Sequence, residues 1–463
     1  MSLRDLAVFL LLAVLLAATF RRPYIGVLGW VLFGVLNPHR LTWGPALYFQ
    51  FSLAIALATL VSTLLTRDHR ELKGGAPAVV LLVLLLWATL NALLGFNPPR
   101  ALDYLDRVAK TFLFIWLILL LMHTRQHVNM LLGTLLFSMA FYGTKGGLFV
   151  LAKGGEYRVS GPDSSMIAGN NELAAALVIA IPLLYYNYMQ LQKRWQRYGV
   201  LAVICLCALS VIGSYSRGAL LAILSMSVFL WLRSTHKGLL GVALVALVFV
   251  AIPFMPDQWF DRMQTIQTHE EDASASYRLI AWETAYNLAK DRFPLGGGFE
   301  YETQEVSTRY SPLPSLVMVP HSIYFQSLGG LGFIGLGLFL LFWLLVWRQC
   351  AWLRKHCKTP STLWAGQLGS MVQVSLVGYA IGGAFLNLAF WDGVYYIYAA
   401  IGVTLYAVRK QMGEEAAAAL AGPAPAAALA PPAALPSPAF GTGSPQGPPP
   451  PTTPRPARRH ERT

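Results

Sequence analysis

His321 is the residue of this sequence that is best suited to moving a proton. It stands in the run Pro320-His321-Ser322-Ile323-Tyr324, where a long polar loop gives way to an apolar block. Because the ordinary pKa of histidine is close to neutral, such a residue can act as a general base. A hydrogen-bonded boundary residue is the alternative interpretation. We predict that His321 is the base and that Tyr324 binds substrate beside it.

Arg217 is the strongest candidate for binding an anion. It lies in a tight turn between two apolar blocks, in the run Ser214 to Ala219, with no acidic residue near it in the sequence. An arginine at the centre of a membrane helix costs about 2.5–3.5 kcal/mol, so a membrane-embedded arginine is a functional candidate by default. The planar guanidinium binds two phosphate oxygens at once. We therefore expect a phosphate or pyrophosphate site at Arg217.

Further polar residues lie at the same ends of the apolar blocks. The cations among them, which are candidates for binding the same substrate, are Arg107, Lys110, Lys145 and Arg158. Their alternative role is to extend toward the membrane interface or to pair with acids such as Asp103 and Asp106. Asn170 and Asn171 open another apolar block, where they either cap a helix or offer polar groups to the anion or to a sugar.

The composition of the chain shows what must position these residues. The chain has 463 residues, of which 56% are hydrophobic and 12% are charged, whereas about 25% of an ordinary soluble protein is charged. Many apolar blocks are roughly 17–25 residues long, which is enough to cross the hydrocarbon of a bilayer. We predict an all-α, polytopic membrane protein. The net charge of +13 then indicates cytoplasmic loops and membrane lipids as partners, and not nucleic acid.

The distribution of basic loops predicts how the chain crosses the membrane. The short basic loops, which the positive-inside rule places in the cytoplasm, lie at 67–73, 123–127, 193–197, 233–237, 348–358 and from 409 onward. The short block 24–36 is interpreted as re-entrant or interfacial. This gives about twelve spans with both termini inside, nine of them within 1–255 and three within 321–408. A path of thirteen spans with the N-terminus outside is the alternative.

Two segments do not belong to the spans. Residues 256–320 form one large periplasmic loop between spans nine and ten, which is too long for a structureless connection. Within it, 273–290 has helical periodicity, Arg278 and Trp282 share one face, and three glycines follow at 296–298. Residues 409–463 turn into an Ala- and Pro-rich stretch with few large apolar residues. We expect them to be a disordered cytoplasmic tail.

The order of these motifs resembles that of a known family. Ser216-Arg217-Gly218-Ala219 begins a span, Arg278 and Trp282 lie four residues apart in the outer loop, Pro294 to Gly298 forms a turn, and His321-Ser322 ends the loop. Over roughly residues 100–408 the chain resembles the O-antigen ligase and O-antigen polymerase superfamily of the bacterial inner (cytoplasmic) membrane. It is also similar to exosortase-associated O-glycosylation ligases.

The resemblance implies a glycosyltransferase whose active site faces the periplasm. The donor would be a polysaccharide linked to undecaprenyl pyrophosphate, and the acceptor a sugar hydroxyl of lipid A–core. Arg217 and Arg278 would hold the pyrophosphate, and His321 would deprotonate the acceptor in an inverting reaction that uses no metal and no cofactor. An O-antigen polymerase or a protein O-oligosaccharyltransferase is the alternative within the same chemistry. A transporter of lipid-linked oligosaccharides is the alternative outside it.

Overall fold

The computed structural model describes residues 1–66, 71–163, 165–233, 237–238, 241–242, 273–421 and 447. The predicted span at 239–255 and the first part of the periplasmic loop therefore lie almost entirely outside the described residues. Over the described ranges the regular structure is helical, without strands, as an all-α chain requires. The chain divides into two units, Met1–Met412 and Gly413–Thr463. All that follows on packing concerns the first of them.

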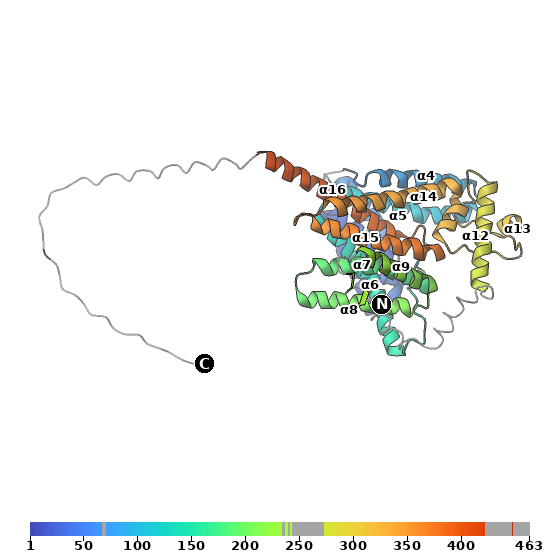
Figure 1. Ribbon diagram of the computed structural model, residues 1–463, viewed down its shortest axis with the longest axis horizontal. Helices are drawn as coiled ribbons and strands as arrows, with labels where there is room; N and C mark the ends of the chain where they lie inside the picture. Colours follow the sequence, from blue (N-terminus) through green and yellow to red (C-terminus); the bar gives the residue numbers. More distant parts are fainter. Residues whose placement is uncertain are drawn as a thin grey trace. The chain divides into compact units, whose positions relative to one another are not determined.

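The helices follow the apolar blocks closely (Figure 1). Their bounds are α1 Leu3–Arg21, α2 Pro23–Val35, α3 Phe51–Leu65, α4 Ala76–Leu94, α5 Pro98–Leu121, α6 Arg125–Lys153, α7 Asn170–Gln190, α8 Arg194–Ile212, α9 Arg217–Arg233, α12 Ala273–Asp291, α13 Gln304–Tyr310, α14 Ile323–His356, α15 Leu363–Gly382 and α16 Asp392–Ala421. By length and composition, 7 described helices are able to cross a membrane: those that begin at Leu3, Ala76, Arg125, Asn170, Arg194, Ile323 and Leu363.

Successive long helices run between the same two ends of the bundle. At one end, the amide N of Lys73 donates to the carbonyl O of Leu119 at 3.2 Å, and Gln190 donates to Gln367 at 2.7 Å. We name this the basic end, because it carries loops 71–75 and 357–362. At the other end, Phe96 N donates to Gly297 O at 2.9 Å. We name it the site end, because it carries residues 213–216 and His321.

The N-terminal helices correct one prediction. The amide N of Ala46 donates to Asp5 Oδ1 at 3.3 Å, so α1 begins beside residues that follow α2. Ser62 Oγ donates to the carbonyl O of Thr19 at 2.7 Å, which joins the last turns of α1 and α3. Since α1 begins at the site end, residues 1–36 make two passes through the bundle and not one. This arrangement of α1 and α2 speaks against a re-entrant 24–36 and favours the thirteen-span alternative.

The misreading of α2 has a physical cause. Its 13 residues extend only about 20 Å, which is too short for a helix surrounded by lipid. Yet α2 packs against α1, α3, α5 and α6, and Val27, Val31 and Phe33 are fully buried. A short helix is tolerated where protein, rather than hydrocarbon, surrounds its ends.

The C-terminal prediction also needs correction. Helix α16 continues to Ala421, whereas disorder was expected from residue 409. The stretch from Glu414 to Ala421 is rich in Ala and Glu, which are strong helix formers, and this explains the continuation. Most of the remaining tail lies outside the described residues.

Helix α14 is broken near its beginning. Gly332 has φ 71°, inside a helix that otherwise runs for 34 residues. The backbone of the glycine loop fills the break, because Gly297 N donates to Gly329 O at 2.7 Å and Gly298 N donates to Gly330 O at 2.9 Å. A Cβ on Gly296 would lie 2.5 Å from Gly332 N, so the glycine at 296 is required by close backbone approach. The loop that carries α12 is thereby fastened to α14.

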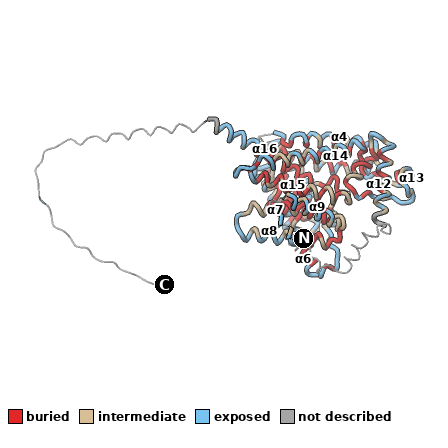
Figure 2. Tube along the Cα trace, in the orientation of Figure 1, coloured by how far each residue is buried: buried red, intermediate tan, exposed pale blue. Residues whose placement is uncertain are grey.

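Burial follows the position of each helix in the bundle. Buried residues gather on α7 and α15, whereas exposed residues are frequent on α8 (Figure 2). Exposed residues are also frequent on α1. Many of the exposed side chains are large and apolar, for example Leu10, Leu86 and Leu201. This pattern fits helices that expose one apolar face to lipid and bury the other against neighbouring helices.

Candidate functional site

His321 is held at the site end by contacts on both sides of it in the chain. Trp282 Nε1 donates to the carbonyl O of Pro320 at 2.6 Å, and the indole ring stacks on Phe325 with centroids 4.9 Å apart. The amide N of Ser322 donates to Asn387 Oδ1 at 3.2 Å. His321 itself has φ 42°, in the left-handed region that is uncommon for residues other than glycine. Such strain, when the surroundings enforce it, is often found at functional sites.

The charges around His321 favour its neutral form. Burial lowers the pKa of His321 below its ordinary value, and the positive charge of Arg278 on α12 lowers it further. Glu172, in the first turn of α7, acts in the opposite direction and raises the pKa. A neutral imidazole has a nitrogen lone pair that accepts a proton, so the site is suited to general-base chemistry. Arg278 and His321, predicted from the sequence to act together, are thus close enough for their charges to interact.

Arg217 is the first residue of α9 and lies at the site end, as His321 does. Gly218 packs against Phe385 of the short 3₁₀ helix η4, Gly383–Phe385, where a Cβ would be 3.2 Å from the phenylalanine Cβ. On the other side of η4, a Cβ on Gly383 would be 2.7 Å from Ile323 Cδ1, at the start of α14. The beginnings of α9 and α14 therefore meet through η4. Both present the positive ends of their helix dipoles at the site end.

Asn170 joins the start of α7 to the Arg217 turn. Its Nδ2 donates to the carbonyl O of Ser214 at 2.7 Å. The N-cap of α7 is Gly169, so the interpretation of Asn170 as the helix cap is wrong, and its side chain instead positions the turn. Asn171 is half-buried in the same first turn. With α7 added, three helix N-termini converge at the site end.

Arg158 also approaches this turn. Tyr215 has φ 57°, and its hydroxyl donates to the carbonyl O of Gly155. The guanidinium of Arg158 lies 6.0 Å from the centroid of the same ring. The loop between α6 and α7 is therefore attached to the turn that carries Arg217, and Arg158 brings a third guanidinium into this region.

Two predicted binding residues occupy other positions. Lys145 is exposed on α6, whereas the glycines near it are buried against α8: Gly143 faces Cys207 and Gly147 faces Leu206. The glycines around Lys145 are thus explained by close helix packing. Tyr324 donates its hydroxyl to the carbonyl O of Ala380 at 2.8 Å, which anchors α14 to α15.

Arg107 and Lys110 line a separate cavity of about 580 Å³, together with residues of α2, the 165–167 loop and the start of α16. Lys110 pairs with Asp106, one turn away, as expected from their spacing. Arg107 lies 5.6 Å from the ring centroid of Tyr104. Gln326 donates to the Tyr104 hydroxyl at 3.3 Å, so the wall of this cavity is connected to the first turn of α14.

The sequence analysis missed several residues that shape the site. Glu172 is not among the residues predicted from the sequence, although its charge acts on His321. Phe325 is not predicted from the sequence, because it is one of 24 phenylalanines. Asn387 is not predicted either, because its residue type alone does not indicate a site. The four-residue spacing of Arg278 and Trp282 was the one available signal that both face the same place.

Comparison with known families agrees with this geometry. Residues 3–192 match a family described as one of unknown function (DUF5935). Residues 201–340 match the family described as O-antigen ligase. No curated protein matches the chain. Arg217, Arg278 and His321 all fall within the second matched segment. Residues 201–340 thus form an O-antigen ligase family domain, which supports membership of the chain in the O-antigen ligase superfamily.

Proposed function

We propose that the chain is an O-antigen ligase of the bacterial inner membrane. It transfers polysaccharide from undecaprenyl pyrophosphate to a sugar hydroxyl of lipid A–core on the periplasmic side. The observation that carries this proposal is the grouping of His321, Arg278 and Glu172 beside three helix N-termini at one end of the bundle. A lone histidine or a lone arginine would not support group transfer, whereas a base beside anion-binding groups does.

In the proposed reaction, the acceptor hydroxyl oxygen attacks the anomeric carbon of the donor sugar. His321 takes the hydroxyl proton as the new carbon–oxygen bond forms, and the bond to the pyrophosphate oxygen breaks with its electron pair. General-base assistance of this kind contributes about 10²–10⁴-fold to the rate. Attack from the face opposite the leaving group inverts the anomeric configuration.

The leaving group explains the arginines in this proposal. Negative charge grows on the pyrophosphate as the glycosidic bond breaks, and preorganised donors aimed at such charge stabilise the transition state. Arg217, at the start of α9, and Arg278, on α12, approach this region from different elements. The positive ends of α7, α9 and α14 add to their effect. Charge neutralisation is therefore assigned to the protein, without a metal.

An apolar groove near His321 suits the lipid part of the donor. A cavity of about 330 Å³ lies between α14 and α15, lined by Tyr324, Leu340, Trp343, Trp347 and other apolar residues. Its lining begins two residues after His321, at Ile323, beside the point where Tyr324 is anchored to α15. In the proposal, a polyprenyl chain lies along this groove while its pyrophosphate reaches the arginines. In this proposal, Tyr324 binds the substrate by lining the groove that holds the polyprenyl chain.

The test is a transfer assay with the purified, full-length protein. Lipid-linked polysaccharide and lipid A–core are incubated with it, and the product is detected as a slower-migrating band. His321→Asn is the best variant, because Asn tolerates a positive φ and lacks a base. We expect its turnover to fall at least about 10²-fold, with donor binding retained.

The same assay separates the alternatives. If lipid A–core yields no product while a second donor chain or a pilin does, the protein is a polymerase or a protein O-oligosaccharyltransferase. If liposomes show movement of the donor across the bilayer without transfer, the protein is a transporter. Normal turnover by His321→Asn would show that His321 is not the base.

A further inference from the structure

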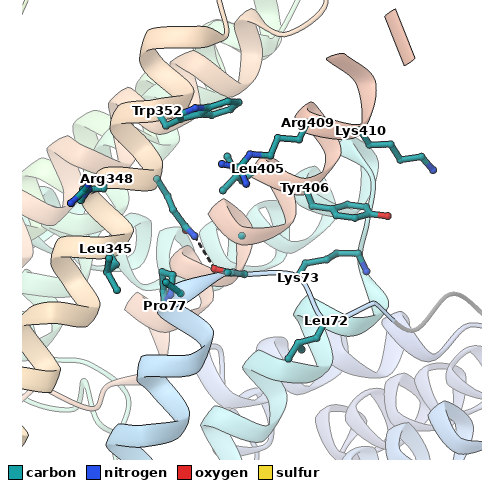
Figure 3. A pocket seen from close by; sticks show the side chains of 15 residues that line it. Leu72, Lys73, Pro77, Leu345, Arg348, Trp352, Leu405, Tyr406, Arg409 and Lys410 are labelled. Atoms are coloured by element: carbon teal, nitrogen blue, oxygen red, sulfur yellow. Dashed lines mark hydrogen bonds between the residues drawn. The ribbon is translucent and has the colours of Figure 1, made fainter. Parts of the chain in front are cut away.

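Another cavity, lined by apolar and cationic residues, lies at the opposite end of the bundle from His321. It has a volume of about 650 Å³ and is formed by loop 72–77, the C-terminal part of α14 and α16 (Figure 3). Its volume is in the range of about 300–1,000 Å³ that is typical of ligand sites. Among the described residues that line it, none is acidic and four are cationic: Lys73, Arg348, Arg409 and Lys410.

Lys73 is built into one wall of this cavity. Its Nζ donates to the carbonyl O of Glu71 at 2.9 Å and to that of Leu120 at 3.1 Å. The ammonium also lies 4.9 Å from the ring centroid of Tyr406, whose hydroxyl donates to Glu71 Oε2 at 3.1 Å. The lysine is nearly buried, so its charge is held in place and not carried on a mobile side chain.

Arg409 is positioned by an aromatic ring on the other wall. Its guanidinium lies 4.9 Å from the ring centroid of Trp352 on α14, and the two residues face each other in Figure 3. A guanidinium that packs on an aromatic ring with its face keeps its N–H groups in its own plane, where they can bind a ligand beside it. Gln349 donates to the carbonyl O of Gly74 at 2.8 Å, which fixes the loop between the walls.

The beginning of α4 strengthens the positive character of the cavity. Gly75 is the N-cap of this 19-residue helix, has φ 63° and makes no side-chain cap. Gly75, Ala76 and Pro77 all line the cavity. The positive end of the α4 dipole therefore adds to the four cations.

The depth of the cavity fits the headgroup layer of a bilayer. Gln349 follows the break at Gly332 by about 26 Å of continuous helix at 1.5 Å per residue, and the hydrocarbon of a bilayer is about 30 Å thick. With His321 at one interface, the cavity lies at the other. Trp352 and Tyr406 are the residue types that gather at such interfaces. Leu72, Leu345 and Leu405 complete the lining with apolar surface.

We propose that this cavity binds the phosphate headgroup of an anionic glycerophospholipid of the cytoplasmic leaflet. Lys73 and Arg409 contact the phosphate oxygens, and the acyl chains leave along Leu72 and Leu345. Cations beside aromatic rings and apolar side chains suit a ligand with both a charged headgroup and acyl chains. A soluble anion has no apolar part to contact the leucines.

The test is lipid retention by the full-length protein, measured by native mass spectrometry with phosphatidylglycerol or phosphatidylcholine. Arg348→Gln/Arg409→Gln removes two exposed cations of the cavity. Lys193→Gln/Arg194→Gln is the matched control, because it removes two exposed cations at the same end that do not line the cavity. We expect preference for phosphatidylglycerol in the natural protein and a loss of affinity of about ten- to thirtyfold in the first variant, with little change in the control.

Three outcomes would overturn the proposal. Equal retention of phosphatidylcholine would remove the requirement for an anion. An equal loss in the control variant would show that only the net charge of this end matters. Displacement of the lipid by inorganic phosphate at the same concentration would identify a site for soluble anions. Melting curves without added lipid check that both variants remain folded.

Discussion

At the scale of single residues, the site depends on the proton affinity of His321. Burial lowers the pKa of His321, Arg278 lowers it further and Glu172 raises it. If neutral His321 is the base, kcat/KM falls on the acidic side as the imidazole gains its proton. The lowered pKa places this fall below the ordinary histidine range of about 6.5. The two neighbouring charges then provide a test in which the sign of the shift matters.

We predict opposite shifts for two charge-removing variants. Glu172→Gln removes a charge that raises the pKa of His321, so the acidic limb of kcat/KM should move to lower pH. Arg278→Gln removes a charge that lowers that pKa, so the limb should move to higher pH, together with a loss of about 10²–10³-fold in kcat. The measurement is the pH profile of kcat/KM. Shifts in one common direction, or none, would mean that His321 does not set the limb.

At the scale of elements, the site depends on the break in α14, against which the loop of residues 294–298 packs. Gly332 has φ 71°, and a Cβ there would lie 2.6 Å from the carbonyl oxygens of both Pro294 and Leu295. With ψ −174°, Gly332 lies in a region open essentially only to glycine, which costs other residues about 1–3 kcal/mol, and the clash with backbone atoms adds to this. The loop that holds Arg278 and Trp282 would then lose its attachment.

We therefore predict that Gly332→Ala lowers both stability and activity. The thermal inactivation midpoint should fall by several degrees, and transfer should fall with it at a fixed temperature. Gly337→Ala is the control, because the same helix carries it and a Cβ there meets nothing within 4 Å. That variant should be neutral or slightly stabilised, since Ala is the better helix former by about 1 kcal/mol. Equal damage in both variants would refute the proposed role of the break.

The helices also show which parts of the fold and of the candidate site could be predicted from the sequence. Block lengths predicted most helices, and residue type with order along the chain made Arg217, Arg278 and His321 the candidate site residues. Of these, Arg278 and His321 lie close enough for their charges to interact. The pattern failed at α2, because helix length was compared with lipid thickness although α2 is surrounded by protein. The glycines beside Lys145 pack on α8, so they do not by themselves support a binding role for Lys145. Glu172 could not be assigned to His321, because 149 positions of chain separate them and only the fold brings them together.

At the scale of the whole molecule, the contact between Asp5 and Ala46 fixes the direction of the first three helices. We predict that residues 3, 48 and 157 lie on the periplasmic side and residue 358 on the cytoplasmic side. The test is labelling of intact spheroplasts with a membrane-impermeant maleimide. It uses single cysteines, Leu3→Cys, Tyr48→Cys, Tyr157→Cys or Lys358→Cys, in a background without the four native ones. The first three should react and the fourth should not. Protection of Leu3→Cys would restore the twelve-span path.

The break at Gly332 has a further consequence for how the protein responds to its bilayer. The part of α14 after the break is about 36 Å long at 1.5 Å per residue, so it spans the hydrocarbon by itself. A helix adjusts to a thicker or thinner bilayer by tilting, and we expect the part of α14 after the break to take up this tilt. The His321 end should then change little, so we predict that transfer varies little with acyl-chain length in reconstituted membranes.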